Sequence, residues 1–185
     1  TYTGEPRHFD DSDFVKLMDT EATRNYSSAD LYKRTVSMIK IDADSSYIVD
    51  LFRVSGGSTQ EYSFHGGEST NTTVEGLELY EKSGTYAGAD TQFGVMPEGD
   101  VSSGNPGYYW LYDVKAQDDP ESGFSIDWAI KDTYNVYGNG AHADTDIHLK
   151  LTMLGDYDTV SMAKGNPPSH AGAASYYDYV IVKNT

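Results

Sequence analysis

The segment 30–65 constrains the fold most strongly, because it holds three strand-forming runs separated by two turn-forming breaks. The runs cover 31–41, 47–54 and 59–65, and the breaks read DADSS and SGGS. Small polar residues and paired glycines of this kind join antiparallel strands. The segment therefore predicts a three-stranded meander, beside which further strands can be laid.

The middle run of the meander is apolar on both sides. Alternate residues of a strand face opposite ways, and in 47–54 each set is mainly apolar. Such a strand is expected to be covered on both faces. Asp50 then lies among apolar neighbours and needs a partner, because an unpaired buried carboxylate is costly. Arg34 and Arg53, from the same meander, are the candidates.

The rest of the chain continues the strand pattern. Alternation is clearest in 124–130 and 146–154, where Trp128 belongs to the row expected to face the core. Residues 1–29 are predicted to form a lead-in segment before the sandwich, with a possible short helix that begins near Ser12 or Asp13. The prediction is one all-β domain over 1–185, an antiparallel β-sandwich over 30–185 with about nine or ten strands and at most one short helix. Its other predicted strands are 74–80, 108–114, 159–163 and 177–182.

The charge of the chain excludes some partners. It carries 29 acidic and 13 basic residues, a net charge of −16, so nucleic acid and anionic membrane surfaces are not expected partners. The same charge opposes an acidic polysaccharide at long range, unless a basic patch or a bound cation offsets it. The chain has no cysteine, 16 tyrosines and 18 glycines. This composition is typical of a secreted, extracellular bacterial β-protein with wet aromatic surfaces.

Three short sequence segments of the meander resemble a known family. They are LYKRTV at 31–36, YIVDLFRVSGG at 47–57 and EYSFHG at 61–66, and DIHLKLTMLG at 146–155 continues the likeness. Together they resemble the late, C-terminal β-sandwich of heparinase II/III-like polysaccharide lyases. The resemblance implies a parent enzyme that cleaves uronic-acid polysaccharides by β-elimination, with a Tyr and His pair moving protons. The matched segments contain no catalytic signature. The sequence also shows no counterpart of the α/α-toroid that precedes the sandwich in that family.

Aromatic residues are the leading candidates for binding carbohydrate. Sugar faces rich in C–H groups stack on apolar rings that have a polar rim. As a strand, the cluster at 108–112 places Tyr108, Trp110 and Tyr112 on one side, which serves either the core or a stacking platform. Further candidates are Tyr134 and Tyr137, in a turn rich in glycine and asparagine, and Arg53.

His65 and the segment 142–148 are the candidates for other chemistry. His65 ends a strand before Gly66 and Gly67, and a catalytic role needs a Tyr, a carboxylate or a metal beside it. The alternative is a hydrogen-bonded histidine at a strand end. In the second segment His142, Asp144, Asp146 and His148 occur at every second position. They predict a structural zinc or calcium site that uses some of the four, or else a solvated turn before a strand.

Three functions remain open from the sequence. The first is a non-catalytic accessory domain of a secreted lyase, which binds acidic polysaccharide and contacts the remainder of its parent enzyme. The second is a part of the lyase cleft, inactive without the missing toroid, in which His65 and a tyrosine contribute to β-elimination. The third is a structural spacer in a large surface protein.

Overall fold

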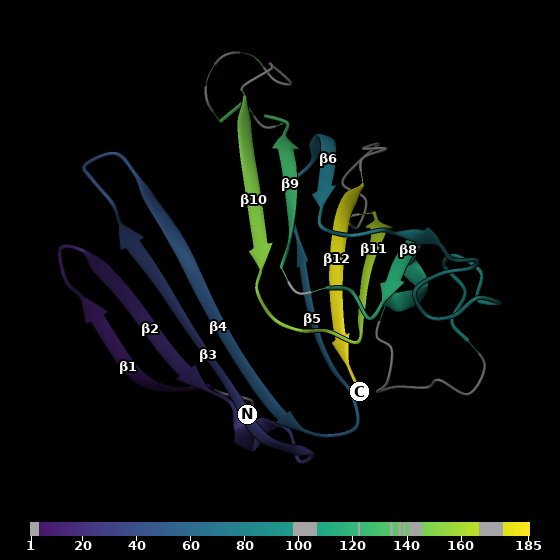
Figure 1. Ribbon diagram of the computed structural model, residues 1–185, viewed down its shortest axis with the longest axis horizontal. Helices are drawn as coiled ribbons and strands as arrows, with labels where there is room; N and C mark the ends of the chain where they lie inside the picture. The colour runs from purple at the N-terminus through teal and green to yellow at the C-terminus, as the bar shows by residue number, and fades with distance from the viewer. Residues whose placement is uncertain are drawn as a thin grey trace. The chain divides into compact units, whose positions relative to one another are not determined.

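The computed structural model describes residues 4–97, 107–121, 123–133, 135–136, 138, 140, 146–166 and 176–185. The fold of these residues is all-β, with twelve strands in three antiparallel sheets and no α-helix (Figure 1). Residue contacts divide the chain into two compact units, unit 1 at Thr1–Gln60 and unit 2 at Glu61–Thr185. The predicted single domain over 1–185 stays a prediction.

Unit 1 is one four-stranded sheet in the order β1-β2-β3-β4. Its strands are β1 (Glu5–Asp11), β2 (Val15–Glu21), β3 (Ala29–Lys40) and β4 (Ser46–Gly56), with a 3₁₀ turn at Thr23–Asn25. The helix expected near Ser12 is therefore wrong. The Ser12 hydroxyl instead donates to the Val15 carbonyl at 2.8 Å, and the Val15 N–H donates to the Ser12 oxygen at 3.1 Å. These two bonds close the β1–β2 hairpin, since serine favours turns as well as helix starts.

The meander predicted from 30–65 is confirmed at β3 and β4, but its third strand, β5 (Gln60–His65), pairs with β12 (Tyr177–Asn184) in another sheet, so that part of the prediction is wrong. Their register places Val36 opposite Asp50 and Arg34 opposite Phe52. Arg34 pairs with Asp50, with Nη2 2.5 Å from Oδ2, so one of the two expected partners is confirmed. The cover expected on both faces of β4 is not found among the described residues. Tyr47, Ile48 and Leu51 are 49%, 64% and 55% exposed.

Unit 2 is a β-sandwich of a three-stranded and a five-stranded sheet. The orders are β10-β9-β6 and β5-β12-β11-β8-β7. A 3₁₀ turn at Tyr108–Trp110 leads into β8. The strands are β5 (Gln60–His65), β6 (Ser69–Glu75), β7 (Tyr80–Glu81), β8 (Leu111–Asp118), β9 (Phe124–Ile130), β10 (Ile147–Met153), β11 (Thr159–Gly165) and β12 (Tyr177–Asn184).

The core of unit 2 lies between these two sheets. Trp128 and Ile126 of β9 are fully buried, as the alternation of 124–130 predicts, against Val160 of β11 and Val180 of β12. The indole N–H of Trp128 donates to the Asp178 carbonyl at 3.0 Å, which satisfies the one polar group of this side chain. Gly66 is buried against the same ring, since a Cβ added there would come 2.6 Å from Trp128 Cγ.

Candidate functional site

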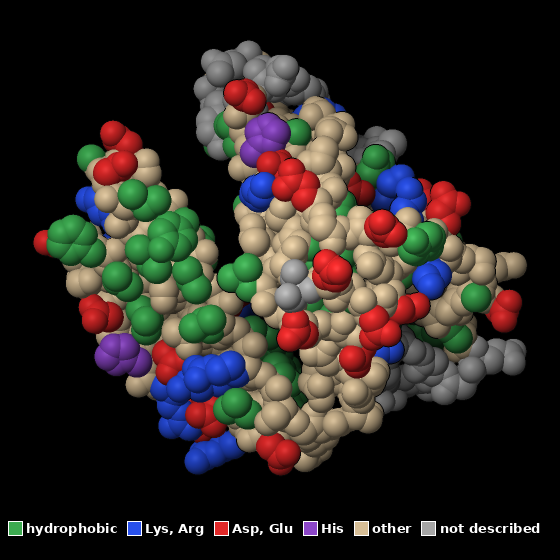
Figure 2. Space-filling model, viewed as in Figure 1, with side chains coloured by type: hydrophobic (Ala, Val, Ile, Leu, Met, Phe, Trp, Pro, Cys, Tyr) green, Lys and Arg blue, Asp and Glu red, His purple; other side chains and the backbone are tan. Residues whose placement is uncertain are grey.

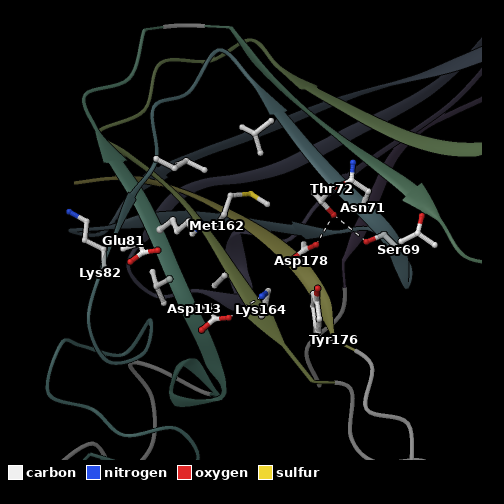
Figure 3. A pocket seen from close by; sticks show the side chains of 16 residues that line it. Ser69, Asn71, Thr72, Glu81, Lys82, Asp113, Met162, Lys164, Tyr176 and Asp178 are labelled. Carbon is white, nitrogen blue, oxygen red and sulfur yellow. Dashed lines mark hydrogen bonds and ion pairs between the residues drawn. The ribbon is translucent and has the colours of Figure 1, made fainter.

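A groove opens in unit 2 beside strand β6, over strands β7, β8, β11 and β12 (Figure 3). Its volume is about 590 Å³. The floor is apolar and includes Val74, Leu79 and Met162. The polar lining comes from four types of side chain, namely hydroxyl, amide, carboxylate and ammonium. It consists of Ser69, Thr70, Asn71, Thr72, Glu81, Lys82, Asp113, Lys115, Lys164, Tyr176 and Asp178.

Strand β6 provides the hydroxyl wall of the groove. It lies at the edge of its sheet and reads STNTTVE, which suits an edge that water reaches. Thr72 pairs with Trp128 of β9, so its side chain points between the sheets. There the Thr72 hydroxyl donates to Asp178 Oδ2 at 2.6 Å. This bond ties β6 to β12 across the end of the core (Figure 3).

Asp113 sits on an irregularity of strand β8. Met162 of β11 pairs with Lys115 of β8, and Lys164 pairs with Tyr112. Between these two pairs β8 therefore has one residue more than β11, which is a β-bulge. Asp113 takes a left-handed backbone with φ 49°, which costs a non-glycine residue about 1–2 kcal/mol. Bulges and strained residues of this kind concentrate at functional sites, where they aim a side chain.

The bulge directs the Asp113 carboxylate onto Lys164. Asp113 Oδ2 accepts a hydrogen bond from Lys164 Nζ at 2.9 Å. The same Nζ lies 4.7 Å from the centre of the Tyr176 ring, a cation–π contact. The hydrogen bond from Lys164 to Asp113 raises the pKa of the lysine, which keeps the ammonium charged.

The groove differs in charge from the rest of its unit. Unit 2 has 19 acids and six lysines, and it has no arginine. Three of those lysines, Lys82, Lys115 and Lys164, line the groove beside three acids. The groove is therefore close to neutral within a strongly acidic unit.

Three rings, named here the ring platform, contact one another, and one of them, Tyr112, pairs with Lys164 of the groove lining. Phe93 packs edge-on against Trp110 and Tyr112, with ring centres 5.3 and 5.1 Å apart. Phe93 is 45% and Trp110 49% exposed. The Tyr112 hydroxyl donates to Asn166 Oδ1 at 3.0 Å. Burial raises the pKa of Tyr112, and the nearby charges of Lys164 and Asp113 also act on it. Tyr112 thus joins the platform to the groove.

Tyr108 does not belong to this platform. The 3₁₀ turn at Tyr108–Trp110 breaks the alternation expected for 108–112, so the shared face predicted for Tyr108, Trp110 and Tyr112 is wrong. The Tyr108 hydroxyl donates to Glu61 Oε2, and the Tyr86 hydroxyl donates to Glu61 Oε1 at 3.1 Å. Burial, together with the Glu61 carboxylate, raises the pKa of both phenols.

The remaining carbohydrate candidates lie elsewhere. Arg53 belongs to unit 1, where Nη2 donates to Thr35 Oγ1 at 3.1 Å and lies 3.8 Å from Asp19 Oδ1. Tyr134 and Tyr137 lie outside the described residues. Their roles in binding stay predictions.

His65 is exposed and held between two tyrosines. Its ring stacks on Tyr177 at 5.2 Å with 7° between planes, and lies 4.6 Å from the Tyr179 ring. Its Nδ1 is 2.7 Å from the Gly66 carbonyl oxygen, which accepts a hydrogen bond when this nitrogen carries the proton. This matches the hydrogen-bonded strand-end histidine, and a catalytic role stays a prediction.

Half of the predicted metal set lies within the described residues. His142 and Asp144 lie outside the described residues, whereas Asp146 and His148 lie within them. His148 Nδ1 is 2.5 Å from Asp127 Oδ1, and Nε2 is 3.6 Å from Asp146 Oδ1. The hydrogen bond to Asp127 raises the pKa of His148. Within the described ranges no group of three or more His, Asp or Glu side chains is placed to hold a metal. Zinc or calcium binding stays a prediction.

Comparison with models of known protein families gives no match, and comparison with curated proteins gives none either. The resemblance to heparinase II/III-like lyases therefore stays a prediction. In the part of the chain that is described, no helix is long and apolar enough to cross a membrane.

Proposed function

We propose that unit 2 binds a carbohydrate chain, with one sugar over the ring platform and its neighbours in the groove. The observation that supports this is the pairing of Tyr112, one of the three rings, with Lys164 in the lining of an open groove that has both donors and acceptors. A sugar presents C–H faces to rings and hydroxyl groups to polar side chains. Phe93 and Trp110 provide the rings, while Asn71, Asp178 and Lys164 provide hydrogen-bonding groups.

The proposed carbohydrate is an acidic polysaccharide. Half of the lysines of unit 2 line the groove, which lowers locally the repulsion that the rest of the unit exerts on an anion. Lys164 is the proposed anchor for a carboxylate, since its ammonium is already oriented by Asp113. The family resemblance of 31–66 points to the same class. In this proposal the chain is a non-catalytic, extracellular part of a polysaccharide lyase and works beside the remainder of that enzyme.

Calorimetry or affinity electrophoresis with uronic-acid polysaccharides and with a neutral glucan tests the proposal. Binding is expected for the acidic chains and is expected to weaken as salt is added. Trp110→Ala is expected to weaken binding about tenfold, because the loss of a stacked ring costs roughly 1.4 kcal/mol. Tyr47→Ala is the matched control, since both rings are 49% exposed and Tyr47 lies in unit 1.

A charge variant tests whether Lys164 binds a carboxylate of the polysaccharide directly or only adds to the general electrostatic attraction. Lys164→Gln is expected to weaken binding of acidic chains and to leave any binding of neutral glucan unchanged. Lys183→Gln, in the same unit but outside the groove lining, is the control. If no polysaccharide binds, or if Trp110→Ala and Tyr47→Ala behave alike, the proposal fails. Release of unsaturated uronate by the chain would favour the lyase-cleft alternative instead.

A further inference from the structure

The lysine that is proposed to anchor a carboxylate already has a partner in the groove. Lys164 Nζ donates to Asp113 Oδ2 at 2.9 Å (Figure 3). The side chains of Lys164 and Asp113 are 33% and 57% exposed, so a ligand in the groove can reach both. An ammonium carries more N–H donors than this bond uses, and the others can bind a carboxylate of the ligand. That carboxylate then shares Lys164 with a second negative group.

The other two lysines of the groove lining also lie beside acids. Lys82 Nζ is 3.6 Å from Asp118 Oδ2. Lys115 of β8 pairs directly with Glu81 of β7, and the side chains of such a cross-strand pair are neighbours. The described lining holds three lysines and three acids, a formal charge of zero. The groove therefore contains no cluster of lysines that lacks nearby carboxylates among its described residues.

The surroundings of the groove are strongly acidic. Unit 2 has 19 acids against six lysines, and acidic side chains are spread over the face of the unit that Figure 2 shows. A charged ligand feels this field in addition to its direct contacts. A ligand with one anion in the groove can use Lys164. A ligand with several closely spaced anions places the others beside carboxylates, where like charges repel.

We propose that the groove selects an acidic polysaccharide of low charge density, in which uncharged sugars separate the carboxylated ones, and that Asp113 sets this limit. One carboxylate binds Lys164, and the hydroxyl groups of the uncharged neighbours bind Asn71 and Asp178. Sulfated chains, and chains with a carboxylate on every sugar, bind more weakly because of the like charges. The inference rests on the proposed binding of polysaccharide in this groove and narrows it to one class.

Asp113 is suited to this role by its place on the bulge of β8. The bulge and the left-handed backbone, with φ 49°, aim its carboxylate at Lys164. The hydrogen bond to Asp113 is the main cause that raises the pKa of Lys164, and the charge of Asp178 adds to it. Both carboxylates therefore act on any anion that Lys164 binds, and Asp113 is the one in direct contact with the lysine.

Galacturonans of graded methyl esterification test the limit on one backbone, because esterification removes carboxylate charges and leaves the sugars in place. Calorimetry with the full chain is expected to give the tightest binding at intermediate esterification. The fully de-esterified galacturonan is expected to bind at least about tenfold more weakly than this optimum, through repulsion. The fully esterified one is expected to bind about tenfold more weakly, because it has no carboxylate for Lys164. Unsulfated and sulfated chondroitin form a second matched pair, with tighter binding expected for the unsulfated chain.

The outcomes separate this inference from the proposed function. Affinity that rises steadily with the number of charges overturns the inference, and so does affinity that is highest for the uncharged chain. In both cases carbohydrate binding itself stands. Absence of binding to every chain overturns the proposed function and this inference together. If only one backbone binds, the comparison on that backbone decides.

An aspartate substitution assigns the limit to one residue. Asp113→Asn suits the left-handed backbone and keeps an oxygen that can accept the hydrogen bond from Lys164, so only the charge is removed. It is expected to tighten binding of de-esterified galacturonan, or of sulfated chondroitin, about five- to tenfold. Binding of the fully esterified galacturonan is expected to change by less than about twofold.

Asp119→Asn is the matched control for this substitution. Asp119 has nearly the same backbone, with φ 46°, and it lies in the same unit but outside the groove lining. Its replacement removes the same charge from unit 2 and is expected to change each affinity by less than about twofold. Circular dichroism verifies that both variants keep the fold. Equal effects of the two changes, or no effect of Asp113→Asn, overturn the role of Asp113.

Discussion

The two units are built from the same kind of strand, yet among the described residues only those of unit 2 form a hydrophobic core. In unit 2 the alternation of β9 buries Ile126 and Trp128 completely, because a second sheet lies over them. In unit 1 the alternation of β4 leaves Ile48 and Leu51 more than half exposed. Strand content and hydrophobic pattern therefore form a sheet, whereas a second layer is needed to form a core.

The charge is divided as unevenly as the core. Unit 1 holds all four arginines and has seven bases against ten acids. Unit 2 has six bases against 19 acids, and half of those bases line one groove. Arginine forms planar paired contacts with carboxylates, as Arg34 does with Asp50. Ion pairs and cross-strand bonds thus carry more of the structure of unit 1, and apolar burial carries more of unit 2.

The largest effect is expected from the centre of the core. Trp128→Ala removes a fully buried indole and is expected to lower the free energy of unfolding of unit 2 by about 3–5 kcal/mol. Leu51→Ala, the counterpart in unit 1, is expected to change stability by no more than about 0.5 kcal/mol. Urea denaturation followed by circular dichroism measures both. Similar costs for the two changes would remove the contrast between the units.

A smaller effect is expected where the backbone meets the same ring. Gly66→Ala places a methyl group 2.6 Å from Trp128 Cγ and is expected to cost about 1–3 kcal/mol through overpacking. Gly67→Ala is the neighbouring control, because the nearest atom to its added Cβ, Ile130 Cδ1, is 3.8 Å away. The same denaturation experiment compares them. A neutral Gly66→Ala would mean that the core tolerates a shift of the indole.

In unit 1 the sensitive group is the carboxylate of Asp19. Hydrogen bonds from Lys33 and Thr35 lower its pKa. A lowered folded pKa adds stability above the unfolded value of about 3.9, and this stability is lost as the pH falls through the folded pKa. Asp19→Asn is expected to remove this part of the acid dependence. Hydrogen exchange of β2 and β3 amides at neutral and acidic pH measures it, and equal acid sensitivity in both proteins would contradict the role of Asp19.

The smallest effect is expected at His148 in unit 2. Its pKa is raised, first by the hydrogen bond to Asp127. A raised folded pKa adds stability below the unfolded value of about 6.5, which is lost as the pH rises through the folded pKa. The Tm of the parent chain is therefore expected to exceed that of His148→Gln slightly in mild acid and to match it in mild alkali. A constant difference across pH would show that the ion pair is not responsible.

The strands with one buried face could be predicted from the sequence. The run 124–130 alternates cleanly, and β9 follows it residue for residue. The partner of Asp50 could also be anticipated, because the hairpin turn at 42–46 brings Arg34 close to it in register. In both cases the information is local, or is fixed by one short turn.

Polar strands could not be recognised in the same way. β6 reads STNTTVE, and the predicted strand 74–80 covers only its last two residues, because an edge strand needs few apolar residues. β1 lacks an apolar alternation altogether. Together with β2, these strands account for most of the difference between the nine or ten strands expected and the twelve found.

The candidate site was only partly visible in the sequence. Trp110 and Tyr112 were indicated by their aromatic cluster, but Phe93, Thr72, Lys164 and Asp178 were not. These residues come together only because β6, β8, β11 and β12 meet at one end of the sandwich. No local sequence pattern predicts that residues from four separate strands come together. The bulge of β8 at Asp113 is likewise seen only in the structure.

That bulge restricts what can replace Asp113 over evolutionary time. A left-handed backbone is open to glycine and, at a modest cost, to asparagine and aspartate, whereas β-branched residues are strongly disfavoured. Related chains that keep the bulge are therefore expected to show only Asp, Asn or Gly at this position. Drift there can remove the charge next to Lys164 in a single step, to Asn or Gly, without disturbing the fold. The charge of the groove lining can thus change along a short and predictable mutational path.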